Sequence, residues 1–525
     1  MTLTRAPRPL LPIWWMALFT VLAWTGTRPT PASAQTAPAA LNQDALAHAA
    51  QAGLPPAALK TLRQAQVPPS AVSVLITPLP AANASGLAAE MAPPRLSHRP
   101  QAASNPASVM KLFTTYAGLS LLGPDHVWRN RVYADGAVRD GVLHGNLVVR
   151  GSGDPKLVLE RLQDLLGQVV AAGVREVRGD IVLDRSVFDV RERSEPFDDE
   201  PLRPYNVSPD GLLLNFKAVV YKFTPNATSG QVQVRFEPPL AGMDAQTQLP
   251  ASNAACNDWR SQLKADFSQT LQVRFTGSYP TRCGEREWPV AYPDPEQYAP
   301  RVMQALWLAA GGRLSGQVRY GLRPASARLL VDAPSLPLAE VIQDINKFSN
   351  NVMAQQLFLT LSSELGAPGR FEASRLRVQQ WWRNAAPGQE EPVLDNGSGL
   401  SRTERSTAAS LTALLQAAHS GPHAQAFVKS LSQAGVDGTT ARLKERSPQS
   451  PVIGNAWLKT GSLRDVVSVA GYVQGQSGQR YTVVAIVNHP NASQARPALD
   501  QLLEWAVRDQ NNPGSTSAAL QRQRQ

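Results

Sequence analysis

The chain has 525 residues and a formal net charge of +10, with 51 Lys and Arg against 41 Asp and Glu. This length exceeds one ordinary domain, so we expect two or three compact units. Only two cysteines and seven histidines are present, and neither cysteine has a His or Cys nearby at metal-ligand spacing, which argues against a zinc site.

Residues 1–34 have the pattern of an export signal. Arg5 and Arg8 precede the apolar run LLPIWWMALFTVLAW, and the small residues ASA at 32–34 suit cleavage before Gln35. A membrane anchor is the alternative, although the apolar run is short for a membrane span. We therefore expect an exported, periplasmic protein whose mature chain is soluble.

Export would affect the redox state of the cysteines and the net charge of the mature chain. In an oxidising compartment Cys256 and Cys283 are expected to form a disulfide, and two separate buried thiols are the alternative. Loss of Arg5, Arg8 and Arg28 with the signal, which holds no acidic residue, lowers the net charge from +10 to +7. This modest excess favours peripheral association with the membrane or the sacculus and argues against a nucleic-acid partner.

The predicted elements begin with a short helix at 57–66, a strand at 71–79 and a second helix at 105–123, capped by Asn105 and stopped by Gly123. Short alternating runs with Gly and Asp follow from about residue 130, and they predict hairpins. Helical periodicity dominates from about 296 to 435, and two strands at 466–473 and 480–489 suit neighbouring places in an antiparallel sheet.

This order predicts an α/β fold in which one domain is interrupted by a long insertion. The interrupted domain comprises residues 35–131 and 296–510, because the helix at 105–123 and the later helices lie on opposite sides of the β-rich part. The insertion covers 132–295 and is expected to form two subdomains. Residues 511–525 have the composition of a disordered tail.

The helix at 105–123 contains Ser108 and Lys111, a pair three positions apart. Its apolar residues recur at helical spacing, so one face can be buried while Ser108 and Lys111 share another face. An S-x-x-K match alone is weak evidence, and a capped surface helix is the alternative. Ser261 and Lys264 form a second match, but we expect them in a strand, where residues three apart point to opposite faces.

Two further motifs follow the insertion. Ser349, Asn350 and Asn351 stand between two helical runs, where polar side chains can project into a cleft or can cap a helix. The run from Lys459 to Ser462, Lys-Thr-Gly-Ser, opens a strand-like region, where a lysine can also serve only to guard a sheet edge.

The order S-x-x-K, S-x-N and K-T-G resembles that of the penicillin-binding protein and serine β-lactamase superfamily. The long β-rich insertion between the first two motifs resembles that of the class C low-molecular-mass penicillin-binding proteins, the type 4 D-alanyl-D-alanine carboxypeptidase/endopeptidases. The stretches GSGDP at 151–155, YNVSPDGLLLNF at 205–216 and DNGSGLSR at 395–402 also fit this group. The resemblance covers residues 70–505 and implies an antiparallel sheet flanked by helices.

A serine hydroxyl needs a base, and a lysine is a base only when its amine is neutral, a state that burial or a second positive charge favours. In the family, Lys459 would lie beside Lys111 and supply that charge. The resemblance then implies Ser108 as nucleophile, Lys111 as base, Ser349 as proton relay and Asn351 as a substrate ligand. Lys459 would be catalytic as well, while Thr460, Gly461 and Ser462 would bind the substrate carboxylate and oxyanion.

Substrate recognition is also expected to involve the insertion. The resemblance implies that one acidic residue among Asp198, Asp199 and Glu200 meets the free amine of a diamino acid. It also implies that Arg402 and Arg464 bind the carboxylate side of the same substrate. A solvated acidic turn is the alternative.

The resemblance implies D-Ala-D-Ala carboxypeptidase and DD-endopeptidase activity on peptidoglycan stem peptides, with β-lactams as covalent inhibitors. No metal or organic cofactor is expected. A β-lactamase and a non-catalytic envelope-binding protein are the alternatives; efficient turnover of penicillin would indicate the first, and the joint presence of Ser108, Lys111 and Lys459 argues against the second.

Overall fold

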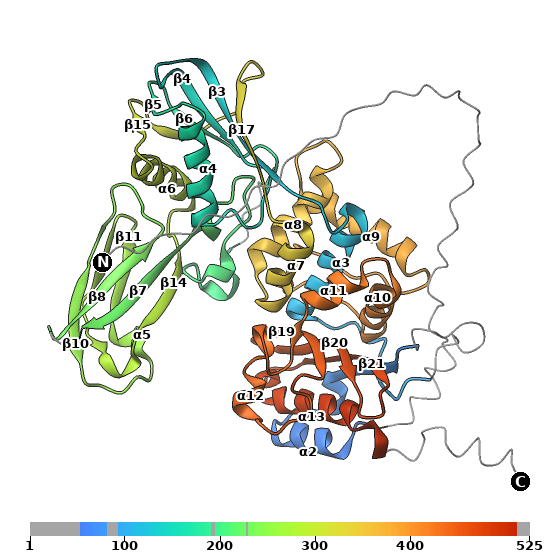
Figure 1. Cartoon of the computed structure of the whole chain (residues 1–525). Helices are drawn as coiled ribbons and strands as arrows, with labels where there is room; N and C mark the ends of the chain where they lie inside the picture. The colour runs from blue at the N-terminus through green and yellow to red at the C-terminus, as the bar shows by residue number, and fades with distance from the viewer. Residues whose placement is uncertain (1–52, 81–92, 191–194, 227–228, 512–525) are drawn as a thin grey trace, which may run out of the picture. The chain divides into compact units, whose positions relative to one another are not determined.

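The computed structural model describes residues 53–80, 93–190, 195–226 and 229–511 (Figure 1). The expected export signal and all but the first residue of the expected tail lie outside these ranges. No helix within the described ranges combines the length and the apolar character needed to span a membrane.

A six-stranded antiparallel sheet organises the part of the chain that carries the three motifs. Its strand order is β18-β19-β20-β21-β1-β2, with neighbours antiparallel throughout. The strands are β1 (Val72–Pro78), β2 (Leu96–His98), β18 (Ser432–Gln433), β19 (Ala456–Leu463), β20 (Val466–Gln474) and β21 (Arg480–Asn488). Pairing of β1 with β21 therefore joins segments from opposite ends of the described chain.

Both faces of this sheet are covered, which explains the nearly continuous apolar sequence of its central strands. In β21, Val484 and Ile486 belong to one core and Val483 and Ala485 to another, since neighbouring side chains in a strand point to opposite faces. The first core packs α3 (Lys111–Leu122), α7 (Leu338–Lys347), α8 (Asn351–Ser363), α9 (Phe371–Ala385), α10 (Ala408–Ser420) and α11 (Ala424–Ser430). The second packs α2 (Pro56–Gln64), the short α12 (Leu443–Arg446) and α13 (Arg496–Val507).

The β-rich region begins with a seven-stranded mixed sheet. It contains β3 (Arg129–Arg139), β4 (Val142–Arg150), β5 (Glu176–Val177), β6 (Ile181–Asp184), β15 (Arg313–Leu314), β16 (Val318–Tyr320) and β17 (Arg328–Pro334). The helices α4 (Leu159–Ala171) and α6 (Pro295–Ala309) contribute to the same core as this sheet.

A second group of strands in this region forms a five-stranded sheet, ordered β13-β10-β8-β7-β14, and a three-stranded sheet, ordered β11-β12-β9. The strands are β7 (Ala218–Asn226), β8 (Gln231–Glu237), β9 (Asp244–Ala245), β10 (Gln248–Ser252), β11 (Ala265–Gln269), β12 (Gln272–Phe275), β13 (Tyr279–Pro280) and β14 (Arg286–Ala291). Cys256 and Cys283 are joined in a disulfide across 27 positions, which confirms the expected pairing.

The mixed sheet bears on the domain boundaries expected from the sequence. The insertion was expected to end at residue 295, but β15, β16 and β17 pair with β5, β6 and β3, and α6 packs into the same core. We therefore propose that the insertion runs from Arg129 to Pro334.

The second S-x-x-K match differs from the expectation in its local structure. Ser261 lies in the one-turn helix α5 (Trp259–Gln262), and not in a strand. Asp258 caps this helix by accepting a hydrogen bond from the Ser261 backbone N–H, and the Ser261 hydroxyl donates to the Asp258 carbonyl at 2.9 Å. The strand expectation was wrong for Ser261 and Lys264 because this capped turn precedes the strand, whereas the alternating Ala265 and Phe267 do lie in β11 (Ala265–Gln269).

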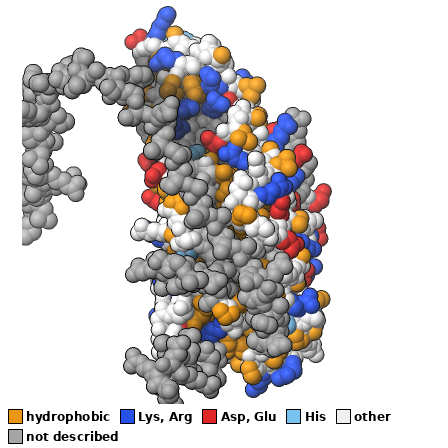
Figure 2. Space-filling view, turned by 90° about the vertical axis from the view of Figure 1, so that its right-hand side faces the viewer, with side chains coloured by type: hydrophobic (Ala, Val, Ile, Leu, Met, Phe, Trp, Pro, Cys, Tyr) orange, Lys and Arg blue, Asp and Glu red, His pale blue; other side chains and the backbone are white. Residues whose placement is uncertain are grey.

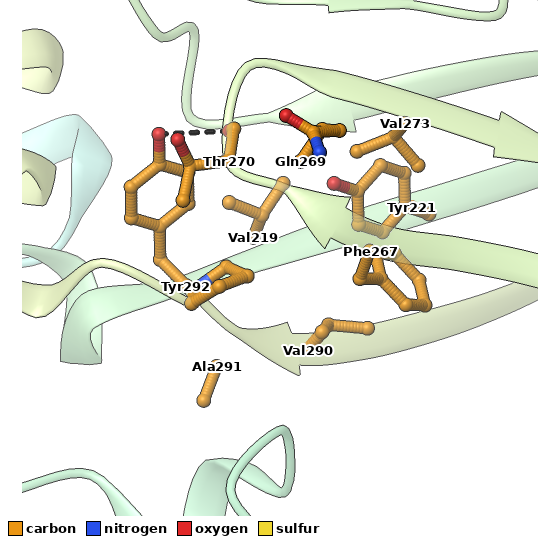
Figure 3. A pocket seen from close by; sticks show the side chains of 10 residues that line it. Val219, Tyr221, Phe267, Gln269, Thr270, Val273, Val290, Ala291 and Tyr292 are labelled. Carbon is orange, nitrogen blue, oxygen red and sulfur yellow. Dashed lines mark hydrogen bonds between the residues drawn. The ribbon is translucent and has the colours of Figure 1, made fainter.

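One small cavity lies in the insertion, between β7, β11, β12 and β14 (Figure 3). Apolar and aromatic side chains such as Val219, Tyr221 and Phe267 line it, and the Tyr292 hydroxyl donates a hydrogen bond to the Thr270 carbonyl at 2.9 Å. Its volume of about 10 Å³ is close to that of a single water site. We interpret it as a packing void rather than a binding site.

On the face shown in Figure 2, basic and acidic side chains are interspersed over the visible surface. The net positive charge of the chain is therefore spread out on this face, outside the parts that grey atoms cover. Such a distribution gives only weak, salt-sensitive attraction to anionic polymers.

Candidate active site

The turn that carries Ser108 is held in a constrained backbone conformation. Residues Ala107–Met110 form a 3₁₀ turn that leads into α3, so the helix expected from residue 105 begins as a tighter turn. Ala107 has a φ of 47°, in the left-handed region that a residue with a side chain rarely adopts. The Asn105 side chain supports this conformation by accepting the Ala107 N–H at 2.8 Å.

Two glycines allow other segments to approach this turn closely. A Cβ on Gly399 would lie 2.0 Å from the Ala107 carbonyl oxygen, and a Cβ on Gly461 would lie 2.6 Å from that of Pro106 and 3.0 Å from the Ser108 nitrogen. Gly399 also has a φ of +80°, which favours glycine. The Lys-Thr-Gly motif of β19 therefore lies directly against the serine turn.

Lys111 is fully buried at the start of α3 and points at the serine. Its Nζ donates to Ser108 Oγ at 2.9 Å, to Asn351 Oδ1 at 2.6 Å and to the Ser398 carbonyl. Burial lowers the pKa of Lys111 to about 7, while the nearby Glu404 acts in the opposite direction. A substantial fraction of Lys111 can therefore be a neutral amine near pH 7, as a general base requires.

The second half of the site is built around Lys459, which is also fully buried. Its Nζ donates to Ser349 Oγ at 2.9 Å and to the Thr460 carbonyl at 2.6 Å. Burial, and then the charge of Lys111, hold the pKa of Lys459 well below its usual value. Burial is thus the main cause of the lowered pKa for both lysines, and the second positive charge is a lesser cause that acts on Lys459.

The S-x-N motif lies at the junction of α7 and α8. Asn350 caps α8 by accepting the Met353 N–H at 3.1 Å, so the capping role falls on the middle residue of the motif. Ser349 has a φ of 57°, a second left-handed residue at the site. In this conformation the Ser349 side chain accepts a hydrogen bond from Lys459 and the Asn351 side chain accepts one from Lys111. The motif therefore lies between the two lysines.

The expected substrate-binding residues lie along β19 and beside it. Thr460 is partly exposed and its hydroxyl donates to Thr439 Oγ1 at 2.8 Å. Ser462 is exposed and its hydroxyl accepts a hydrogen bond from Arg496 at 2.8 Å. The close approach of Gly461 to the Pro106 carbonyl and the Ser108 nitrogen places this part of β19 directly beside the serine turn.

The acidic segment of the insertion meets the other expected residues. Asp198 accepts a hydrogen bond from Arg402 at 2.5 Å and lies 3.8 Å from Arg464, while Asp199 is exposed. Arg402 also pairs with Asp465 at 2.7 Å. The structure therefore pairs Asp198 with the arginines, which had been assigned to the opposite end of the substrate, and Arg464 remains the most exposed cation of the group.

The same segment touches a predicted catalytic residue. Asn351 Nδ2 donates to the Tyr205 carbonyl at 3.2 Å, and the Arg402 guanidinium lies 4.5 Å from the ring centre of Phe197. Residues 197–205 of the insertion, which we call the insertion segment, thus border the site on the side of Asn351 and Arg402.

Sequence reasoning missed several residues that hold the site together. Ser468 Oγ donates to the Pro106 carbonyl at 2.7 Å, the Ser398 carbonyl accepts from Lys111, and Glu404 is completely buried near Lys111. The stretch DNGSGLSR was noted as fitting the family, but a single glutamate in the polar stretch SRTERST shows no periodicity that marks it as buried. No cluster of His, Cys, Asp and Glu within the described ranges is arranged to hold a metal ion.

A serine bonded to a buried lysine, with a second lysine on the adjacent sheet strand, defines a serine hydrolase site of the penicillin-binding and serine β-lactamase class. Residues 76–508 match the D-Ala-D-Ala carboxypeptidase 3 (S13) family. The chain belongs to this family and to the class C low-molecular-mass penicillin-binding proteins, as the sequence resemblance had implied.

Individual relatives agree with this assignment. A D-alanyl-D-alanine carboxypeptidase of Actinomadura sp. (strain R39) is 30% identical over 418 residues, which cover 76% of each chain. The D-alanyl-D-alanine carboxypeptidase DacB of Haemophilus influenzae is 26% identical over 390 residues, covering 73% of this chain and 80% of the relative. The chain is therefore a hydrolase of the D-Ala-D-Ala carboxypeptidase class.

The fold has a counterpart among solved structures. Penicillin binding protein 4 of Haemophilus influenzae superposes with a TM-score of 0.65 at 22% identity, covering 82% of this chain and 96% of the other. This likeness confirms the expected fold, a penicillin-binding domain of sheet and helices with a large β-rich insertion.

Proposed function

We propose that this chain trims and cleaves peptidoglycan stem peptides through an acyl-enzyme on Ser108, as both a D-Ala-D-Ala carboxypeptidase and a DD-endopeptidase. The observation that carries the proposal is the 2.9 Å hydrogen bond between Ser108 Oγ and the fully buried Nζ of Lys111. A lysine in this environment can accept the serine proton near neutral pH.

In the acylation step, Ser108 Oγ attacks the carbonyl carbon of the penultimate D-Ala and transfers its proton to neutral Lys111. The tetrahedral intermediate then collapses, the C–N bond to the leaving group breaks, and the leaving nitrogen takes up a proton. Ser349, which accepts a hydrogen bond from Lys459 at 2.9 Å, is the group proposed to relay this proton. Water then hydrolyses the ester, which regenerates Ser108 and releases the shortened peptide.

Two further features support this chemistry. The backbone N–H groups of Ser108 and Ser462 would stabilise the oxyanion, because β19 lies against the serine turn. Lys459 and Thr460 would bind the terminal carboxylate, while Asn351 would orient the substrate amide and hold Lys111 through the 2.6 Å bond.

The leaving group distinguishes the two activities at one site. If a single D-Ala leaves, the reaction is that of a carboxypeptidase; if a D-Ala to diamino acid cross-link is cut, the reaction is that of an endopeptidase. We propose that Asp198 and Asp199 recognise the free amine of the diamino acid and that Arg464 and Arg402 attract its carboxylate. The hydrogen bond from Arg402 holds the Asp198 side chain in one position. Less conformational entropy is therefore lost when Asp198 binds the substrate ammonium.

The expected location and partners are part of the same proposal. The 1–34 pattern favours export to the periplasm, where peptidoglycan is the substrate and β-lactams would be covalent inhibitors. Weak attraction of the positive chain to the sacculus or the membrane surface would assist contact with the substrate.

The proposal is tested by incubating the purified protein with a stem pentapeptide and with a cross-linked dimer, and by measuring release of D-Ala and of monomer. We expect the wild-type protein to release both D-Ala and monomer. Ser108→Ala should lose roughly 99% or more of each activity, since the acyl-enzyme cannot form without the serine hydroxyl. Rapid penicillin turnover without either product would indicate a β-lactamase, and activity retained in Ser108→Ala would contradict the assignment of the nucleophile.

A further inference from the structure

Glu404 is a carboxyl group that the proposed mechanism does not use, and it is completely buried in the loop before α10. Its Oε1 accepts two backbone N–H groups, from Asp395 at 3.1 Å and from Gly397 at 2.9 Å. Its Oε2 is buried and has no hydrogen-bond partner among the residues that the structure describes. A buried carboxyl oxygen without a partner is costly, so its presence needs an explanation.

The two backbone hydrogen bonds connect Glu404 to Lys111. They hold the turn at residues 395–398, and the next carbonyl along this turn, that of Ser398, accepts a hydrogen bond from Lys111 Nζ. The turn is held from the other side by Thr114 of α3, whose hydroxyl donates to the Gly397 carbonyl at 2.6 Å. Glu404 thus supports the carbonyl that orients Lys111.

We propose that Glu404 is a positioning residue for Lys111: it holds the turn that presents the Ser398 carbonyl, and its charge sets the pH range in which Lys111 acts as a base. This inference rests on the proposed role of Lys111. It adds to the S-x-x-K, S-x-N and K-T-G residues a buried carboxyl group that acts on Lys111 through the turn at 395–398.

The electrostatics agree with this geometry. Burial raises the pKa of Glu404 to about 7 and lowers that of Lys111 to about 7. Each charge also favours the other, because Glu404 raises the pKa of Lys111 and Lys111 lowers that of Glu404. The other charged groups facing the pair are Lys459, whose pKa the charge of Lys111 lowers, and the partly exposed Asp395, which raises the pKa of Glu404.

The sign of the expected effect follows directly. A negative Glu404 stabilises the ammonium of Lys111 and so delays its conversion to a base as the pH rises. Removal of that charge should let Lys111 lose its proton at lower pH. A purely structural Glu404 would change the maximal rate without moving the pH range.

The test is the pH dependence of acylation by benzylpenicillin, measured in single turnover between about pH 5.5 and pH 9.5. Glu404→Gln keeps an acceptor for the two backbone N–H groups and removes the charge. We expect the rising part of the plot of acylation rate against pH, the rising limb, to move at least about half a pH unit lower in this variant. Its maximal rate should stay within about threefold of that of the wild-type protein. A limb that coincides with that of the wild-type protein would overturn the proposal.

Two variants serve as controls. Glu404→Asp keeps the charge, so its limb should stay near the wild-type position even if the shorter side chain lowers the maximal rate. Thr412→Val removes another buried oxygen, on α10, that has no hydrogen-bond partner within the described ranges and so makes no hydrogen bond with Lys111 there. This variant should change neither the pH dependence nor the maximal rate of acylation. A limb shift in Thr412→Val equal to that of Glu404→Gln would also contradict a specific role for Glu404.

A second measurement applies if Glu404→Gln does not fold. With ¹³Cδ-labelled glutamate, one carboxyl of the wild-type protein should titrate near neutral pH, and Lys111→Met should raise its pKa because the coupling is reciprocal. Absence of such a carboxyl, or no response to Lys111→Met, would refute the coupling. This readout is independent of acylation: a protein that titrates as expected but is never acylated would contradict the proposed function and not the pairing.

Discussion

Burial of two lysines close enough for the charge of Lys111 to lower the pKa of Lys459 makes a doubly charged state costly. Lys111 and Lys459 are both 0% exposed, and burial is the main cause of the lowered pKa of each. Asn351 accepts a hydrogen bond from Lys111 and Ser349 accepts one from Lys459, and neither acceptor carries a negative charge that would stabilise the ammonium form. The arrangement therefore favours the neutral amine of Lys111 beside Ser108, and a lysine must be neutral to act as a base.

Replacing Lys111 by Arg tests the role of this amine. Guanidinium stays protonated at every accessible pH, so Lys111→Arg should lower the rate of acylation by about 100-fold or more. In the wild-type protein the rate should rise with pH through the region of the Lys111 pKa of about 7, because the neutral form increases there. Stopped-flow acylation by a chromogenic β-lactam checks both results.

The residue-scale expectations differ in how far the sequence could support them. The S-x-x-K spacing predicts that Ser108 and Lys111 can meet, and the structure shows their hydrogen bond. Glu404 could not be predicted, since its burial depends on how the nearby turn at 395–398 packs against α3, which lies far from it in the sequence. The left-handed conformations of Ala107 and Ser349 were equally invisible, because residues with a side chain rarely adopt this conformation and the sequence carries no pattern that marks it.

At the scale of elements, the insertion segment at 197–205 links the insertion to the site. It reaches Asn351 through the Tyr205 carbonyl and reaches Arg402 through Asp198 and Phe197. A surface segment of short turns between strands can place charged side chains near a substrate without taking part in the chemistry. This position favours a role in substrate recognition.

The double variant Asp198→Ala/Asp199→Ala separates recognition from chemistry. We expect kcat/KM for stem peptides containing a diamino acid to fall about tenfold or more, since a charge-assisted hydrogen bond to the ammonium is lost. Acylation by benzylpenicillin, which lacks the diamino acid, should remain nearly unchanged.

Glu200→Ala is the matched control, because Glu200 is exposed in the same segment and pairs only with Arg203 at 3.1 Å among the described contacts. Its kinetics should match those of the wild-type protein on both substrates. Equal losses on peptide and penicillin in the double variant would indicate instead that the aspartates support the local structure through Arg402.

Element types were predictable where the sequence pattern is strong and long. The helix at 105–123 and the strands at 466–473 and 480–489 correspond to α3, β20 and β21, apart from the 3₁₀ start of the first. The stretch around Ser261 was misread because a four-residue helix is too short to show a period. Short elements are set by capping and by tertiary contacts, which a periodicity argument does not see.

At the scale of the whole molecule, the fold class and the interrupted domain follow from the order of the motifs. The end that we propose for the insertion could not be read from the sequence, because α6 and β15–β17 have helical and strand patterns that either domain could accommodate. The proposal rests on the pairing of β15, β16 and β17 with β5, β6 and β3. Pairings between strands so distant in sequence depend on the completed fold.

The central claim is that Ser108 is the single nucleophile of this site, and its most direct test is the intact mass of the protein after exposure to benzylpenicillin. We expect one added mass of the complete penicilloyl group, which peptide mapping places on Ser108 and which is absent from Ser108→Ala. Label on Ser349 or Ser261, or an unlabelled wild-type protein under conditions where it remains folded, would contradict this account.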